Sequence, residues 1–141
     1  MEANSEFLYV PQIIVNDALN TGNVIKGSAI LTHRYMFIIA DKVDGAISVN
    51  KPLYNQEYVS AFIANPSEVD LIVFEAEMLS SIPPEFVYSV ADFEMFSVQV
   101  GFGFVGGLRF RRKGGKVQSA SVGKKEIRQN IKDFYIDIIK K

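Results

Sequence analysis

Three stretches rich in branched and aromatic residues open the chain, and this composition predicts β-strands. They span residues 6–15, 24–32 and 34–40. Pro11 in the first stretch has no backbone N–H for a ladder hydrogen bond, so it indicates an edge strand or a bulge. Gly27 in the second stretch indicates a bend or a close backbone approach. His33 and Arg34 lie near the tight reversal that must join the second and third stretches.

The middle of the chain changes from alternation to helical spacing. Residues 55–65 predict one helix, and Pro66 ends it. A second helix is predicted from Ser67, its N-cap, to the stop at Pro83 and Pro84.

This second helix is apolar on two faces. One stripe contains Val69, Ile72, Val73, Ala76 and Leu79, and the other contains Leu71, Phe74 and Met78. A helix of this kind is buried between layers or packs on a partner. We therefore take the stripe of Leu71, Phe74 and Met78 as a candidate surface for a protein partner or for self-association. Packing of the helix on the chain's own sheet is the alternative.

Strand patterns return after Pro84, at residues 86–90, 93–104 and 106–112. The clearest is a hairpin over residues 108–122, in which Gly114 and Gly115 form the turn. An amphipathic helix is then predicted to the end of the chain. Its apolar stripe is Ile127, Ile131, Phe134, Tyr135 and Ile138. A stripe of this width must be buried, and we therefore expect the domain to unfold without this helix.

Composition points to one globular domain over residues 1–141, with a helical insertion at about 55–82. The chain is 48% hydrophobic and contains no Cys, which excludes disulfides and thiolate chemistry. Its only histidine, His33, excludes zinc sites made of several His or of Cys and His. No apolar run approaches the roughly 18 residues of a membrane span, and the N-terminus is unlike a signal peptide. We expect a cytoplasmic protein, either free or peripheral to a membrane.

Residues 27–37, GSAILTHRYMF, resemble a signature of GRAM and bacterial pleckstrin-homology-like domains, in which a glycine precedes Leu-Thr, an arginine and a phenylalanine. The residues that match in spacing are Gly27, Leu31 and Thr32. Arg34 and Phe37 each fall one position early, which predicts a turn one residue shorter. The segment from Phe93 to the C-terminus looks like the second half of such domains.

The resemblance implies an α+β, mostly β fold. The expected architecture is a pleckstrin-homology-like barrel of two near-orthogonal antiparallel sheets, with a helical insertion and a C-terminal capping helix. Pleckstrin-homology domains bind phosphoinositides, typically with basic residues around the first hairpin. The corresponding connection here, residues 16–22, contains Asp17 and no base, with Lys26 close by.

Positive charge is concentrated in the last third of the chain. Eleven of the fifteen Lys and Arg follow Leu108, and only three acids oppose them there. Arginine binds phosphate through paired hydrogen bonds, and a Gly-Gly turn lets backbone amides approach an anion. The candidates for binding an anion or an anionic lipid are Arg109, Arg111, Arg112, Lys113 and Lys116. A solvated rim that discourages aggregation is the alternative.

Nucleic acid is another ligand for the same charges. Phe102, Phe104 and Phe110 interleave with the arginines, as stacking platforms or as core residues. Spacing along a strand favours the core, and the overall net charge of −1 disfavours a dedicated nucleic-acid binder.

Catalytic motifs of the common hydrolase, nucleotide-binding and zinc-protease types are absent from the sequence. Glu68, Asp70, Glu75 and Glu77 could supply oxygen ligands, but residues two apart diverge on a helix, and we expect these carboxylates to be exposed. We therefore expect no metal site, no cofactor and no enzyme activity. The expected function is non-catalytic binding, by an adaptor or scaffold that contacts a protein or an anionic membrane surface. The alternative is a phosphate- or nucleic-acid-binding protein that uses residues 109–116.

Overall fold

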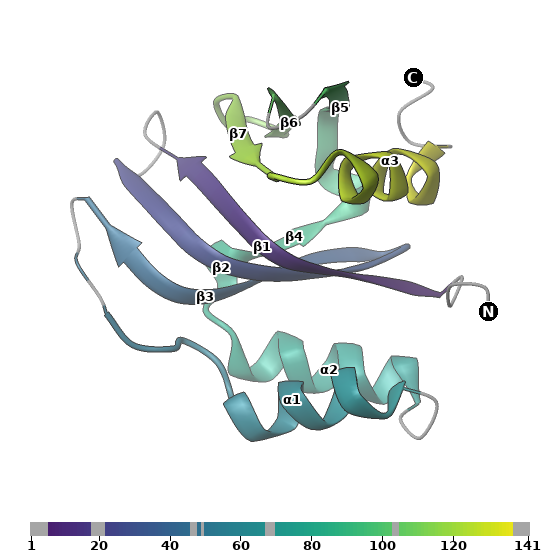
Figure 1. Ribbon diagram of the computed structural model, residues 1–141. Helices are drawn as coiled ribbons and strands as arrows, with labels where there is room; N and C mark the ends of the chain where they lie inside the picture. The colour runs from purple at the N-terminus through teal and green to yellow at the C-terminus, as the bar shows by residue number, and fades with distance from the viewer. Residues whose placement is uncertain are drawn as a thin grey trace.

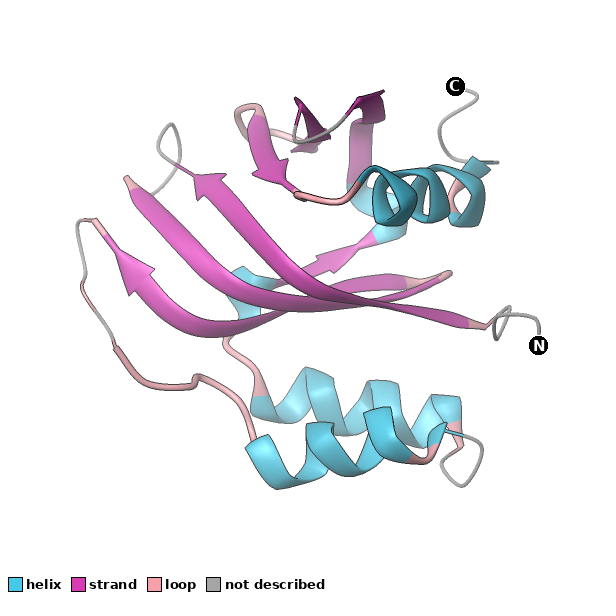
Figure 2. Cartoon of the chain, viewed as in Figure 1, coloured by secondary structure: helices cyan, strands magenta, loops and turns pink. Residues whose placement is uncertain are grey.

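The computed structural model describes residues 6–17, 22–45, 48, 50–66, 70–102 and 105–136, except for the side chains of Phe102 and Val105. Figures 1 and 2 show the arrangement of its elements. In chain order these are β1 (Phe7–Asp17), β2 (Asn23–Thr32), β3 (Tyr35–Asp44), α1 (Gln56–Ala64), α2 (Leu71–Ser81), the 3-10 turn η2 (Pro84–Phe86), β4 (Val87–Ser89), the 3-10 turn η3 (Val90–Asp92), β5 (Phe93–Phe102), β6 (Val105–Arg112), β7 (Gln118–Ser121) and α3 (Lys125–Phe134).

All seven strands belong to one antiparallel sheet in the order β4-β3-β2-β1-β7-β6-β5. β1 is the shared strand, because it pairs with β2 along one edge and with β7 over residues 14–16 on the other. The structure thus has one curled sheet where the family resemblance implies two sheets. The mostly β character and the predicted order of strands and helices are confirmed.

Both faces of the sheet are covered at β2 and β3. Residues 28–32 and 36–40 are buried without alternation. In Figure 1, α1 and α2 lie against one side of β1–β3, whereas β5–β7 and α3 lie on the other side. A sheet covered on both faces needs continuous apolar runs instead of an alternating pattern. The runs AILT and MFIIA meet that need.

Pro11 and Gly27, from which the sequence predicts irregular strands, both lie at register shifts. β1 shifts its pairing between Val10 and Ile13, around Pro11, and β2 shifts between Lys26 and Gly27. Pro11 therefore occupies a bulge in a central strand, so the bulge alternative is confirmed. A side chain at Gly27 would collide with the carbonyl oxygen of Ile39, which explains the glycine at that position.

Helix α2 begins later than the sequence predicts. Its N-cap is Asp70, whose carboxylate accepts hydrogen bonds from the backbone N–H of Ile72 at 2.8 Å and of Val73 at 3.4 Å. The prediction of Ser67 as the cap is wrong, because Asp70 holds these amides; Ser67 itself lies outside the described residues. No helix in the described part of the chain is long and apolar enough to span a membrane.

Aromatic rings attach the helical pair to the sheet. Phe74 of α2 stacks on Phe62 of α1 at 3.8 Å between ring centroids and meets the edge of Phe37 from β3 at 6.1 Å. Phe74 and Met78 are fully buried, and Leu71 is partly buried against the same core. The prediction of an interaction surface on these three residues is therefore wrong, because their stripe faces the chain's own sheet.

Helix α3 packs chiefly against β5 and buries part of its predicted stripe. Ile131 and Tyr135 are fully buried, whereas Ile127 and Phe134 are half-buried. Ile138 lies outside the described residues. The amphipathic helix is confirmed, but Phe134 is not the centre of its contact.

Arg128 of α3, one of the eleven basic residues that follow Leu108, is a core residue with none of its surface exposed. Its Nε donates to the carbonyl oxygen of Val100 at 2.6 Å, and one guanidinium NH donates to that of Val122, also at 2.6 Å. These bonds tie the end of β5 to the segment after β7. Gly106, with a φ of 146°, leaves room for the guanidinium, because a Cβ there would collide with it.

The difference in burial predicts unequal effects of two substitutions in α3. Ile131→Ala should lower the free energy of unfolding by about 2–5 kcal/mol, since it removes a fully enclosed side chain. Phe134→Ala should lower it by only about 1–2 kcal/mol. Urea denaturation followed by circular dichroism measures both, and an equal or larger loss for Phe134→Ala would contradict the placement of α3.

Candidate functional site

The turn between β2 and β3 is built around the hydroxyl of Thr32. Its Oγ1 accepts hydrogen bonds from the backbone N–H of Tyr35 at 2.9 Å and of Arg34 at 3.2 Å. A threonine hydroxyl commonly closes a turn in this way. The same hydroxyl donates to Oε2 of Glu75 in α2 at 2.6 Å. Thr32 therefore links the turn to the helical insertion.

Glu75 is buried, with 3% of its surface exposed, contrary to the expectation of an exposed carboxylate. Its Oε1 accepts from Nε of Arg34 at 3.0 Å and forms an ion pair with the other end of that guanidinium. The hydrogen bond and the charge of Glu75 raise the pKa of Arg34 above its usual value. A buried carboxylate is tolerated because both of its oxygens have partners.

The opposite side of the turn is held by α3 and η3. The Tyr135 hydroxyl donates to the carbonyl oxygen of Thr32 at 2.8 Å, and the backbone N–H of Val90 donates to that of Arg34 at 2.9 Å. The His33 ring stacks on Phe134 at 4.4 Å. Burial raises the pKa of Tyr135 far above its usual range. One turn thus connects the sheet with the insertion and with the terminal helix.

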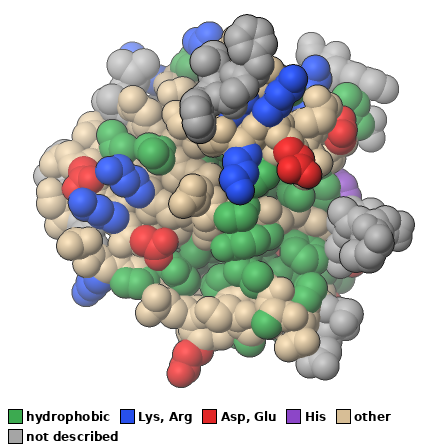
Figure 3. All heavy atoms as spheres, viewed as in Figure 1, with side chains coloured by type: hydrophobic (Ala, Val, Ile, Leu, Met, Phe, Trp, Pro, Cys, Tyr) green, Lys and Arg blue, Asp and Glu red, His purple; other side chains and the backbone are tan. Residues whose placement is uncertain are grey.

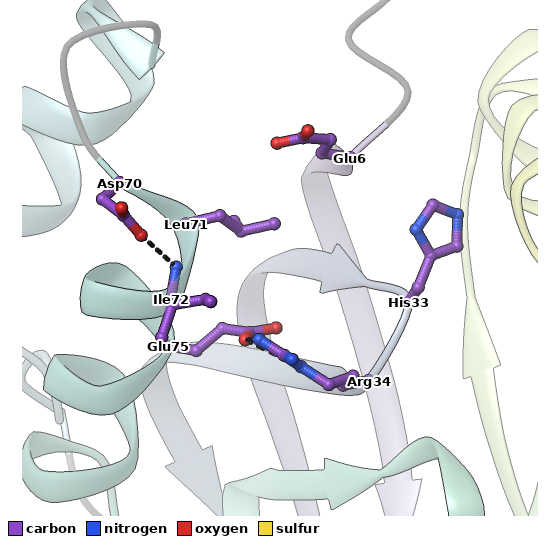
Figure 4. A pocket seen from close by; sticks show the side chains of 7 residues that line it. All are labelled: Glu6, His33, Arg34, Asp70, Leu71, Ile72 and Glu75. Atoms are coloured by element: carbon purple, nitrogen blue, oxygen red, sulfur yellow. Dashed lines mark hydrogen bonds and ion pairs between the residues drawn. The ribbon is translucent and has the colours of Figure 1, made fainter.

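A hollow of about 500 Å³ lies beside this turn. Figure 4 shows it between the start of β1, the β2–β3 turn and the first turn of α2, with the Arg34–Glu75 pair along one side. Its lining residues are Glu6, His33, Arg34, Asp70, Leu71, Ile72 and Glu75. The lining combines three carboxylates with one arginine, one histidine and two aliphatic side chains. We call this hollow the turn pocket.

The outer face of α2 is apolar and open to solvent. Ile72 is 65% exposed, Val73 is 59% exposed and Leu79 is 44% exposed. Together with the exposed Ala76 they form a surface that we call the α2 stripe. Three of the five large hydrophobic residues that are exposed in the described part of the chain belong to it. The sequence predicts two apolar stripes on this helix. The fold exposes the stripe that was not taken as the candidate interaction surface.

Residues 109–116, which we call the basic hairpin, contain five Lys and Arg side chains that lie in different environments. The guanidinium of Arg112 lies 4.1 Å from the centroid of the Tyr88 ring and donates to the carbonyl oxygen of Val87 at 3.5 Å. Arg111 forms an ion pair with Glu94 at 3.7 Å. Arg112 therefore joins β6 to β4, which gives it a structural role independent of any ligand.

Arg109 lies on the outer face of β6, between Ser97 of β5 and Ser119 of β7. A hollow of about 500 Å³ over these strands includes all three residues. Lys113 and Lys116 are exposed near the hairpin turn. On the face shown in Figure 3, several Lys and Arg side chains lie over the upper part of the molecule, where Figure 1 places β5–β7 and α3.

Phe110 is fully buried, so it is a core residue and not a stacking platform for bases. Phe104 and the side chain of Phe102 lie outside the described residues. Within the described ranges, no group of three or more His, Asp or Glu side chains could hold a metal ion.

Comparison of the chain with models of protein families, with curated proteins and with solved structures found no match. The features of the molecule that bear on its function are therefore the turn pocket, the α2 stripe and the basic hairpin.

Replacing the Thr32 hydroxyl tests its role at the turn. Thr32→Val should lower the free energy of unfolding by about 1–3 kcal/mol, because two backbone amides and the Glu75 carboxylate each lose a partner. Thr32→Ser keeps the hydroxyl and should retain most of the stability. Urea denaturation measures both variants, and a loss in Thr32→Ser as large as that in Thr32→Val would contradict the role assigned to the hydroxyl.

Buried tyrosines predict a loss of stability in alkali. Burial raises the pKa values of Tyr88 and Tyr135, whereas in the unfolded chain tyrosine ionises near pH 10. Below that pH both states are neutral, so the contribution is fully present. Above it only the unfolded chain loses protons, and stability falls by about 1.4 kcal/mol per pH unit and per suppressed tyrosine. Denaturation between about pH 9 and about pH 11 should show this fall.

Tyr135→Phe is the matched variant for this pH dependence. It should be less stable at neutral pH, since it lacks the hydrogen bond to Thr32, but its stability should decline less steeply above pH 10. Parallel declines in the variant and the parent would contradict the assignment to Tyr135.

Proposed function

We propose that this protein is a non-catalytic interaction module that binds a partner protein through the α2 stripe. The observation that carries the proposal is the exposure of Ile72, Val73 and Leu79 on two successive turns of one helix. Single exposed hydrophobic residues are normal on protein surfaces, whereas clustered ones mark interaction sites. Full burial of one such side chain contributes about 1.5–3 kcal/mol, so covering all three would favour association substantially.

The spacing of the α2 stripe supports binding in preference to a surface exposed by chance. Ile72, Ala76 and Leu79 follow i, i+4 and i+7, which places them along one side of the helix. This is the pattern by which helices engage partner helices or grooves. The opposite side of α2 already packs on the sheet through Phe74 and Met78, so the helix is held firmly for such a contact.

We also infer that the fold is a pleckstrin-homology-like barrel in which residues 55–82 are the insertion. The strand order β4-β3-β2-β1-β7-β6-β5 and the packing of α3 against β5 support it. Further support comes from residues 27–37, whose resemblance to that family falls on β2, the Thr32 turn and β3. In this proposal the insertion carries the interaction surface and the barrel supports it.

Anion binding at Arg109 is a second candidate function. Ser97 and Ser119 flank this arginine in adjacent strands, and their hydroxyls could add hydrogen bonds to a phosphate group. Cosedimentation with phosphatidylserine vesicles separates the two candidates. Binding that Arg109→Gln abolishes, and that changes in the α2 stripe leave intact, would favour the anion site.

Selection from a random displayed-peptide library tests the principal proposal. Peptides selected on the parent chain should bind the double variant Ile72→Ala/Leu79→Ala at least about 10-fold more weakly, because the variant lacks the two large side chains of the stripe. Alanine favours helix, so the variant should fold like the parent. Ile14→Ala, at another exposed isoleucine, is the control and should retain binding. Selected peptides that bind all three proteins equally would overturn the proposal.

A further inference from the structure

We propose that the occupant of the α2 stripe is a basic amphipathic helix of a partner protein. This inference rests on the proposed function and adds the chemistry of the partner. Three observations support it: the shape of the stripe, the charges beside it and the acidic turn pocket at its N-terminal end.

The shape of the stripe fits a helix. Ile72 and Leu79 are large, and Ala76 between them is small, so the centre of the stripe is lower than its ends. A large side chain of a partner helix can lie over Ala76, which allows the two axes to approach to about 8–10 Å. From Ile72 to Leu79 the stripe covers about 10 Å of helix axis, which is two turns.

The charged groups around the stripe are mostly acidic. Asp70 lies exposed at the N-terminus of α2, and the half-buried Glu77 lies near enough to α1 for its charge to act on Tyr58. The position of Glu77 is consistent with its effect on Tyr58 of α1, whose pKa is raised first by burial and then by the charge of Glu77. Arg34 is the cation of the turn pocket, and it is paired with Glu75.

The turn pocket extends this acidic surface from the end of the stripe. Glu6 and Asp70 contribute carboxylates to its lining, while the charge of Glu75 is paired with that of Arg34. The Asp70 carboxylate also offsets the positive end of the α2 dipole. A lysine or arginine of the partner can place its aliphatic stem along Leu71 and its charge near Glu6 and Asp70. In this proposal the turn pocket binds a cationic side chain at one end of the partner helix.

The same charges disfavour other occupants. Between Lys51 and Arg109 the sequence contains eight acids and no Lys, Arg or His. Docking the α2 stripe against the same stripe of a second copy would bring like charges together, which is unfavourable. An anionic membrane surface would be repelled for the same reason. A cationic helix is the occupant that complements both the apolar stripe and its surroundings.

Three designed helical peptides test this inference by fluorescence anisotropy with the full chain. Each carries the same leucine stripe at i, i+4 and i+7, and the flanking positions are lysine in the first, glutamine in the second and glutamate in the third. We expect the lysine peptide to bind most tightly and the glutamate peptide least tightly. The affinity of the lysine peptide should fall as NaCl rises from about 50 mM to about 500 mM.

Matched charge variants locate the effect. Asp70→Asn/Glu77→Gln should weaken binding of the lysine peptide about 2- to 30-fold, as expected for two charge pairs at one exposed and one half-buried carboxylate. Asparagine caps a helix as well as aspartate does, so the start of α2 is preserved. Asp92→Asn/Glu126→Gln removes two exposed charges outside the helical insertion and should leave the affinity unchanged.

The outcomes separate the inference from the proposed function. If the three peptides bind equally and Ile72→Ala/Leu79→Ala abolishes binding, the stripe is an interaction surface but the basic partner is wrong. If none of them binds, the basic helix is likewise overturned, and the library selection alone decides the proposed function. Sedimentation that shows a dimer dependent on Leu79, or vesicle binding dependent on Ile72, would replace the partner helix by a second copy or by a membrane.

Discussion

The hydroxyl of Thr32 and the buried carboxylate of Glu75 form the contact on which the arrangement of the whole molecule depends. The hydroxyl closes the β2–β3 turn through two backbone amides and donates to Glu75, while Tyr135 binds the carbonyl oxygen of the same threonine. Three separate parts of the chain therefore meet within one turn. Since buried polar groups are expensive to leave without partners, loss of one bond would disturb the insertion, the sheet and the terminal helix together.

The α2 stripe is a consequence of the way the sheet is covered. β2 and β3 are apolar on both faces, and the second half of the chain covers only one of them. Helices α1 and α2 cover the other, which uses one side of α2 through Phe74 and Met78. The remaining side faces solvent, where stability alone would favour polar residues. Its apolar character is the observation on which the proposed contact with a partner rests.

The sequence predicts those features that depend on local pattern. Strand and helix periods, the bulge at Pro11 and the close approach at Gly27 all follow from a few neighbouring residues. It could not choose between the two stripes of α2, because both satisfy helical spacing and only the position of the sheet decides which is buried. The burial of Glu75 escapes the sequence for a related reason, because its partner Thr32 lies 43 residues away; Arg128 likewise bonds to Val100, which lies 28 residues away. From the sequence alone a charged side chain is expected to be exposed, because the local pattern does not show distant partners that would allow its burial.

The distribution of charge along the chain draws attention to the basic last third. In the structure, however, several of these basic side chains have structural contacts. Arg128 is buried among backbone carbonyls, Arg112 covers the Tyr88 ring and Arg111 is paired with Glu94. In the helical insertion Glu75 is paired with Arg34, whereas Asp70 and Glu77 lie next to the exposed α2 stripe. A charge matters for recognition when it lies beside a surface that can exclude water, because the lower dielectric there strengthens its interaction. By that criterion we expect the acidic residues beside α2 to matter more for the proposed partner than the larger number of cations on the hairpin.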